Sequence, residues 1–291
     1  MSLHSLRTLS FFALVLLASS SSFAQASDPQ PQIRTYKTVG STQLKAHVFA
    51  PPDSTPAKLH AAIILLHGGG WDFGDAEWMY RDAALYSGKG MVAIAGEYRL
   101  SDKKSVTPLD AMSDVRDLIR WVRQNSDDLR VNPSQVVVYG VSAGGHLAAS
   151  AAVFPHPDES ITSAIPDALI LLSPAVSLKG DAWPEKLLIG RATAKDISPA
   201  DHVANPLPPI AIFEGAADTV TPLAGARQFC NAVIQAGGTC DLHVYPNVGH
   251  LLTRNLDPRA QEQGPFDPDP ADKADARASQ DAFLKKLGYL P

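Results

Sequence analysis

Residues 136–146, Val-Val-Val-Tyr-Gly-Val-Ser-Ala-Gly-Gly-His, constrain the fold of this chain more than any other segment. The β-branched run predicts a strand that breaks at Gly140, and the residues after Ser142 lead into an alanine-rich stretch typical of a helix. A Gly-x-Ser-x-Gly turn this tight holds its serine in strained backbone angles and leaves little room for neighbouring side chains. The segment therefore predicts a strand, a sharp turn and a helix, with the Ser142 hydroxyl exposed at the end of a sheet.

Strand-like and helix-like segments alternate from residue 61 onward. Apolar runs such as 61–66 are typical of strands buried on both faces, whereas 109–124 carries apolar residues at helical spacing. We predict an α/β fold with a mainly parallel central sheet, helices on both faces and an N-terminal antiparallel hairpin. Strands are expected at 33–39, 44–49, 61–66, 92–97, 136–139, 168–172, 210–213 and 241–245, and helices at 78–89, 109–124, 222–236 and 271–287.

The chain has 291 residues, of which 45% are hydrophobic, and this is enough for one large core. We assign residues 27–291 to a single domain without a large cap. Segment 155–205 is longer than a crossover needs and predicts short helices over the end of the sheet. A turn is expected at Asn132-Pro133, and the proline-rich stretch 264–270 predicts a loop and a helix N-cap rather than a calcium site.

The N-terminus has the pattern of a secretory signal peptide, which we assign to residues 1–26. Arg7 supplies the positive charge, 9–18 is apolar, and small residues allow cleavage near Ala24 or Ala26. The apolar stretch is too short to span a bilayer, so we expect a secreted or periplasmic protein with no stable membrane anchor. The alternative is a buried N-terminal helix.

Charge and motif content narrow the classes of partner. With 25 basic and 30 acidic residues the net charge is −5, and no basic cluster occurs, which argues against nucleic acid. The histidines lack paired metal-ligand spacing, and no phosphate-binding glycine pattern is present. We therefore expect neither a metal nor a cofactor, and the oligomeric state is left open.

The two cysteines, Cys230 and Cys240, fall late in an expected helix and at the start of the next strand. In an oxidising compartment this placement favours a disulfide between them. Two separately buried thiols are the alternative interpretation.

A serine hydroxyl needs a base, and the base needs an orienting acid. His250 follows the last expected strand and is the candidate base, whereas His243 lies inside that strand. Asp218 follows the preceding strand and is the candidate acid, with Glu214 as its competitor. Both positions fall at strand ends, where a parallel sheet places its ligand site. The chain order is serine, aspartate, histidine.

Donors for an oxyanion are expected on two backbone segments. Gly69 and Gly70, in the run His-Gly-Gly-Gly-Trp after a buried strand, can turn bare N–H groups toward Ser142, and Ala143 supplies another. Trp71 is expected either to clamp this loop or to form a wall of the substrate-binding pocket. Two more histidines have expected structural roles: His67 in bracing the loop, and His146 on the helix after the elbow.

With these residues placed, the chain resembles the α/β-hydrolase superfamily over nearly its whole mature length. The segments 67–71 and 140–146 are similar to the acetyl esterase and feruloyl esterase-like branch, which is related to the hormone-sensitive-lipase group. That group usually has Asp where this chain has Val141, and it carries a longer N-terminal cap. These departures imply small, accessible esters. The His-Gly-Gly-x-Trp form also resembles kynurenine formamidases.

The combined interpretation is a secreted serine carboxylester hydrolase. It is expected to act on short acyl or aryl esters, either small molecules or esters linked to a polysaccharide, through Ser142, Asp218 and His250. An arylformamidase or exopeptidase on the same fold is the rival enzyme. A non-catalytic binding protein is the alternative from another class.

Overall fold

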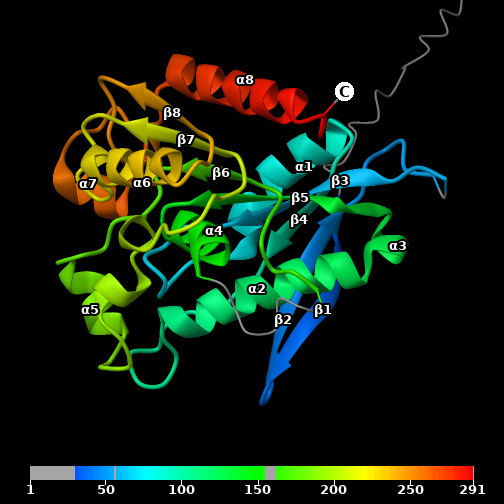
Figure 1. Cartoon of the computed structure of the whole chain (residues 1–291), viewed down its shortest axis with the longest axis horizontal. Coiled ribbons are helices and arrows are strands. Elements are labelled where there is room, and N and C mark those ends of the chain that lie inside the picture. Colours follow the sequence, from blue (N-terminus) through cyan, green and yellow to red (C-terminus); the bar gives the residue numbers. More distant parts are fainter. Residues whose placement is uncertain (1–29, 56, 155–161, 291) are drawn as a thin grey trace, which may run out of the picture.

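The structure is a computed structural model that describes residues 30–55, 57–154 and 162–290. The expected signal peptide lies outside these residues. In the described part of the chain, eight strands form one sheet in the order β1-β2-β4-β3-β5-β6-β7-β8. The β1–β2 and β2–β4 pairs are antiparallel and every other pair is parallel. The predicted mixed sheet with an N-terminal hairpin is confirmed (Figure 1).

The strand positions follow the apolar runs of the sequence. All seven residues of β3 are buried, as are all five of β4, because helices cover both faces of the sheet. The strands are β1 (Gln32–Val39), β2 (Thr42–Phe49), β3 (His60–Leu66), β4 (Val92–Gly96), β5 (Val131–Val141), β6 (Ala168–Leu172), β7 (Ile210–Gly215) and β8 (Cys240–Tyr245).

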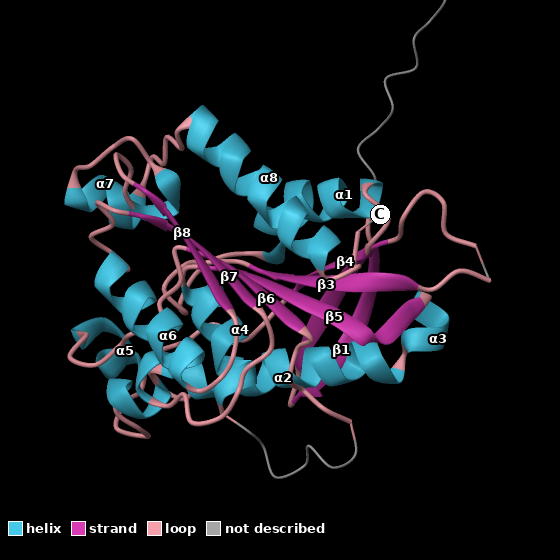
Figure 2. Cartoon of the chain, turned by 45° about the horizontal axis from the view of Figure 1, so that its top comes forward, coloured by secondary structure: helices cyan, strands magenta, loops and turns pink. Residues whose placement is uncertain are grey.

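Helices lie on the two faces of this sheet (Figure 2). One face packs against α1 (Tyr80–Gly88) and α8 (Pro270–Lys286), and the other against α2 (Pro108–Gln124), α4 (Ala143–Val153) and α6 (Leu223–Gln235). Shorter helices are α3 (Ser126–Leu129), α5 (Ala182–Leu187) and α7 (Pro258–Gln263), and 3-10 turns are η1 (Ala76–Met79), η3 (Ala194–Ile197), η4 (Pro199–Asp201) and η5 (His250–Leu252). None of the helices in the described residues is long and apolar enough to cross a membrane.

Two details differ from the sequence prediction, and a third agrees with it. The strand β5 begins at Val131, not at Val136, because the Asn-Pro turn is a break in register within the strand and not its start. The short helices α3 and α7 were not predicted. The loop before α8 is as expected, since Asp269 caps the helix by accepting hydrogen bonds from the N–H groups of Ala271 and Asp272.

Polar contacts run along the interface between α1 and α8. Tyr86 donates to Gln280 at 2.9 Å, Lys89 pairs with Asp281 at 2.6 Å, and Arg277 pairs with Asp82. Asp82, Tyr86 and Lys89 are spaced three or four residues apart along α1 and its C-cap, and their partners fall within residues 277–281 of α8, so the two sets face each other. They hold the middle and the C-terminal half of α8 against α1.

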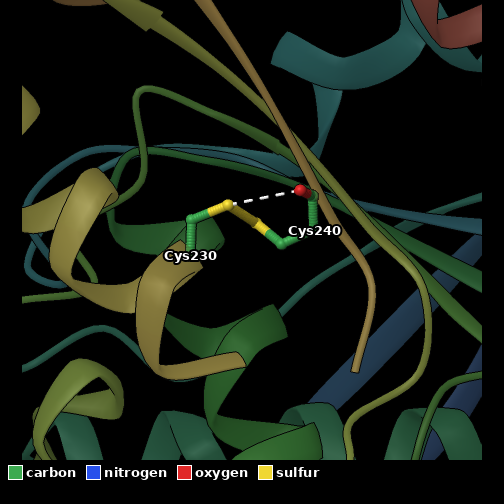
Figure 3. Close-up of a disulfide and its surroundings, with 2 residues drawn as sticks. All are labelled: Cys230 and Cys240. Atoms are coloured by element: carbon green, nitrogen blue, oxygen red, sulfur yellow. Dashed lines mark hydrogen bonds between the residues drawn. A yellow bond between two sulfur atoms is a disulfide. The ribbon is translucent and has the colours of Figure 1, made fainter. Parts of the chain in front are cut away.

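A disulfide joins Cys230 of α6 to Cys240 of β8, as predicted (Figure 3). The two Cα atoms are 5.5 Å apart. The bond closes a short loop, because the two residues are separated by 10 positions. It ties α6 to the edge strand of the sheet. The first residue of β8, the strand that leads toward His250, is thereby fixed to the helix.

Removal of this disulfide tests its contribution to stability. The Cys230→Ser, Cys240→Ser double variant should lower the free energy of unfolding by about 2–3 kcal/mol, because the unfolded chain regains the entropy of a short loop. Denaturant unfolding of both proteins measures this. Reductant should lower the stability of the wild type and leave the variant unchanged. Equal stability of the two proteins without reductant would contradict the assignment.

Candidate active site

Ser142 lies at the sharp turn where β5 ends and α4 begins. Its backbone has φ 53° and ψ −117°, a positive-φ conformation that costs a residue with a side chain about 1–3 kcal/mol. Two glycines make the turn possible. A Cβ on Gly140 would collide with the backbone of Gly144, and a Cβ on Gly144 would collide with the backbone at the end of β3. The Ser142 hydroxyl therefore stands at the N-terminus of α4, as the sequence predicts.

The three residues predicted to react together form one hydrogen-bonded line. His250 Nε2 is 3.1 Å from Ser142 Oγ, and His250 Nδ1 is 2.8 Å from Asp218 Oδ2. Asp218 follows β7 and His250 follows β8, so the carboxyl ends of parallel strands bring together residues far apart in the chain. Asp218 and His250 are both buried, which shields their contact from water.

The environment of Asp218 keeps it ionised. Its carboxylate accepts hydrogen bonds from the N–H groups of Val220 at 2.8 Å and Thr221 at 2.7 Å. Burial alone would raise the pKa of Asp218, but the hydrogen bond and charge of His250, together with Thr221, outweigh burial and lower this pKa. An ionised Asp218 accepts the hydrogen of His250 Nδ1. The lone pair of Nε2 then faces Ser142.

Three side chains that the sequence analysis did not identify hold the base in place. The Thr221 hydroxyl is 3.1 Å from His250 Nδ1 and 3.0 Å from Asp218 Oδ2. Gln261 on α7 accepts the backbone N–H of His250 at 3.0 Å, and Ser173 accepts that of the next residue at 3.1 Å. These contacts cross between distant loops, and no local sequence pattern could have identified them.

The oxyanion donors are oriented by the carbonyls that precede them. In a trans peptide the C=O and the following N–H point in opposite directions. The carbonyl of Gly69 accepts hydrogen bonds from Asp72 and Phe73, both at 3.2 Å, so the N–H of Gly70 is turned away from them. In the described chain, the N–H groups of Gly69, Gly70 and Ala143 donate to no protein group. All three belong to segments that line the cavity beside Ser142.

His67 braces this loop, as expected from the sequence. Its ring stacks on Tyr98 with centroids 4.4 Å apart, and its Nδ1 lies 2.6 Å from the carbonyl of Gly68. The Tyr98 hydroxyl donates to the carbonyl of His67 at 2.8 Å. Burial lowers the pKa of His67, so the ring is neutral at neutral pH. Arg99 anchors the adjoining segment through Asp114 at 2.8 Å.

His243 and Glu214, the alternatives to His250 and Asp218, lie outside the hydrogen-bonded line formed by Ser142, His250 and Asp218. His243 stacks on Phe213, with ring centroids 4.8 Å apart, within the sheet. Glu214 is fully buried at the end of β7. Burial raises the pKa of Glu214 well above its ordinary value, and the charge of Asp218 raises it further. Both carboxyl oxygens of Glu214 are buried without a hydrogen-bond partner among the described residues, and this burial favours the neutral form, so Glu214 is poorly suited to replace Asp218 as the charged partner of His250.

A cavity of about 1220 Å³ lies beside Ser142 and His250. Trp71 borders it with only 3% of its surface exposed, whereas four other lining aromatic residues are more open. These are Phe73, Trp78, Trp183 and Phe266. A short acyl group fills a small part of this volume, so the cavity has room for a larger second part of a substrate. Among the residues the structure describes, no cluster of His, Cys, Asp or Glu could hold a metal ion.

The chain is similar in sequence and in overall structure to known esterases. A family model described as BD-FAE matches residues 47–167. The solved apo form of Thermogutta terrifontis esterase 2 is 32% identical, with a TM-score of 0.78, and the match covers 91% of this chain and 97% of that one. The same esterase has been solved with propionate bound and with butyrate bound.

Curated proteins match over shorter parts of their own length. The esterase LipQ of Mycobacterium tuberculosis is 26% identical over 226 residues, which make up 70% of this chain and 53% of LipQ. An acetylxylan esterase of Xylanibacter ruminicola is 26% identical over 201 residues, which make up 65% of this chain and 40% of that protein. The chain thus spans about half the length of LipQ and less of the acetylxylan esterase.

The protonation of Glu214 can be tested through stability. A carboxyl group whose pKa is raised in the folded state stabilises the fold fully below the unfolded pKa of about 4.3 and loses that contribution as pH rises toward the folded pKa. The Glu214→Gln variant keeps a neutral group of the same shape and has no such loss. Its melting temperature relative to the wild type should therefore rise between pH 4 and pH 8. A difference independent of pH would show that Glu214 is ionised in the fold.

Proposed function

This chain belongs to the α/β-hydrolase esterases of the BD-FAE family, and from that premise we propose that it hydrolyses carboxylic esters of short acyl or aryl acids. The observation that carries the proposal is the line from Ser142 Oγ through His250 to Asp218, with distances of 3.1 and 2.8 Å. Beside it, the unpaired N–H groups of Gly69 and Gly70 lie on the loop that borders the cavity.

The first half of the reaction acylates Ser142. His250 Nε2 takes the hydroxyl proton as Oγ attacks the ester carbonyl carbon, and the carbonyl oxygen becomes an oxyanion. The carbonyl re-forms as the bond to the alcohol oxygen breaks, and His250 gives its proton to the leaving alcohol. Asp218 keeps the imidazole in the required tautomer and stabilises its cationic form.

The second half releases the acid. Water gives a proton to His250 Nε2 and attacks the acyl carbon, and the proton returns to Oγ as the bond to Ser142 breaks. In both halves the negative charge develops on the same oxygen. The N–H groups of Gly69, Gly70 and Ala143 are the donors for it, and one such donor is worth about 3 kcal/mol of transition-state stabilisation.

The proposed substrate has a short acyl group, or an aryl one, and a larger alcohol. Support comes from Thermogutta terrifontis esterase 2, with its propionate and butyrate complexes, and from the similarity to an acetylxylan esterase. The cavity of about 1220 Å³ leaves room for the alcohol part, which we propose to be attached to a polysaccharide or to be a small molecule. Val141, in place of the aspartate usual in lipase-like relatives, is in keeping with small esters.

We propose that the protein acts outside the cytoplasm, after removal of residues 1–26. The support is the charged, apolar and small-residue pattern of that segment. The pairing of Cys230 with Cys240 is in keeping with an oxidising compartment. N-terminal sequencing of the exported protein would locate the cleavage near Ala24 or Ala26.

The Ser142→Ala variant tests the proposed nucleophile. Without Oγ no acyl-enzyme forms, so kcat for 4-nitrophenyl acetate should fall by about 10⁴-fold or more. Ser134→Ala, an exposed serine in the irregular part of β5, is the matched control and should keep wild-type turnover. Turnover near the wild-type level in Ser142→Ala would exclude the proposed mechanism.

A substrate panel tests the proposed class. We expect kcat/KM for 4-nitrophenyl esters to be highest between acetate and butyrate and to fall by about 100-fold or more at laurate. Methyl ferulate, acetylated xylan and N-formylkynurenine extend the panel to aryl, polymeric and formamide substrates. Preference for N-formylkynurenine over every ester would replace the proposal with the formamidase alternative.

A further inference from the structure

We propose that Trp71 and His146 are positioning residues that set the distance between the two halves of the oxyanion site. This inference rests on the proposed ester hydrolysis and extends it to residues that do not touch the reacting atoms. One half of the site, Gly69 and Gly70, belongs to the loop after β3. The other half, Ala143, is the first residue of α4.

A single side-chain hydrogen bond joins these halves. The indole Nε1 of Trp71 donates to Nδ1 of His146 at 3.1 Å, and the two rings meet edge to face, with centroids 5.3 Å apart. Trp71 directly follows Gly70 in the chain, and its own backbone has φ 66°, which an L-residue rarely adopts without support. The Trp71 residue is 3% exposed, so water does not compete for this hydrogen bond.

His146 is prepared to accept that hydrogen bond. Its Nε2 lies 2.7 Å from the carbonyl oxygen of Ile197, which can only accept, so the hydrogen of the neutral ring is on Nε2 and Nδ1 offers a lone pair. The ring is fully buried on α4, four residues after Ser142. Burial lowers the pKa of His146 to about 4, which keeps the ring neutral at neutral pH.

The link acts on catalysis because the donors have to fit an oxygen that is charged only in the transition state. Further contacts fix the loop backbone: Ser101 N–H donates to the carbonyl of Trp71 at 2.8 Å, and the Trp183 indole donates to that of Gly70 at 3.0 Å. Of these three contacts, only that of Trp71 with His146 reaches α4. Its loss should shift the Gly70 N–H relative to Ala143, and a shift of about 1 Å costs roughly 100-fold in rate.

The test uses Trp71→Phe, which removes the indole N–H donor together with part of the ring, and His146→Leu, which removes the acceptor. Each should lower kcat for 4-nitrophenyl acetate by about 10- to 100-fold and change KM by less than about threefold, because the affected interaction forms in the transition state. The double variant should be no slower than the slower single variant, since both remove one link. His146→Gln can accept from Trp71 and donate to Ile197, and should restore kcat to within about threefold of wild type.

Matched controls are Trp121→Phe on α2 and His60→Gln at the opposite end of β3, which should both keep wild-type kcat. Melting temperatures identify variants that do not fold. Wild-type kcat in Trp71→Phe, multiplicative losses in the double variant, or failure of His146→Gln to restore kcat while it folds would overturn the inference.

The rate at which a fluorophosphonate labels Ser142 provides a second measurement that needs no ester turnover. Loss of labelling in Trp71→Phe and His146→Leu, with recovery in His146→Gln, supports the link even if the wild type hydrolyses no ester in the panel. In that case only the proposed function fails. Equal labelling of all variants would overturn the link, whatever the wild type hydrolyses.

Discussion

The positive φ of Ser142 is the constraint on which the rest of the site depends. The chain has to leave β5 and enter α4 within one residue, and only glycine fits at Gly140 and Gly144, where backbone segments meet at atomic contact. The same contact fixes α4 against the end of β3, and thereby against the loop with the oxyanion donors. A strained serine backbone therefore orients the hydroxyl and also defines where the neighbouring loop has to lie.

Much of this arrangement can be predicted from the sequence, because the reactive residues sit at strand ends whose order is fixed by the α/β pattern. Ser142, Asp218 and His250 could each be found from its place after a strand. Thr221 and Gln261 could not, since their contacts with His250 depend on loop conformations that no local pattern encodes. The helix that carries Gln261 is only six residues long and has no apolar periodicity to reveal it.

Two predictions were incomplete because the residue types involved suit more than one local structure. Asn132-Pro133 reads as a turn because both residues are typical of turns, yet the strand continues beyond them with a shift in register against β3. Trp71 had two open roles, clamp or pocket wall, because a tryptophan after glycines suits either. Its indole donates to His146, 75 residues away, while its edge still borders the cavity, so both descriptions apply to one side chain.

The loop that carries His250 is tied at both of its ends. Before it, the disulfide fixes the start of β8, and after it, the contacts with α1 hold α8 in place. Between them, Thr253 pairs with Pro268 and Arg254 with Asp267, which closes the loop on itself. Amide hydrogen exchange in this segment should therefore proceed through global unfolding rather than local fraying. Activity should be lost on heating at the temperature at which the whole protein unfolds.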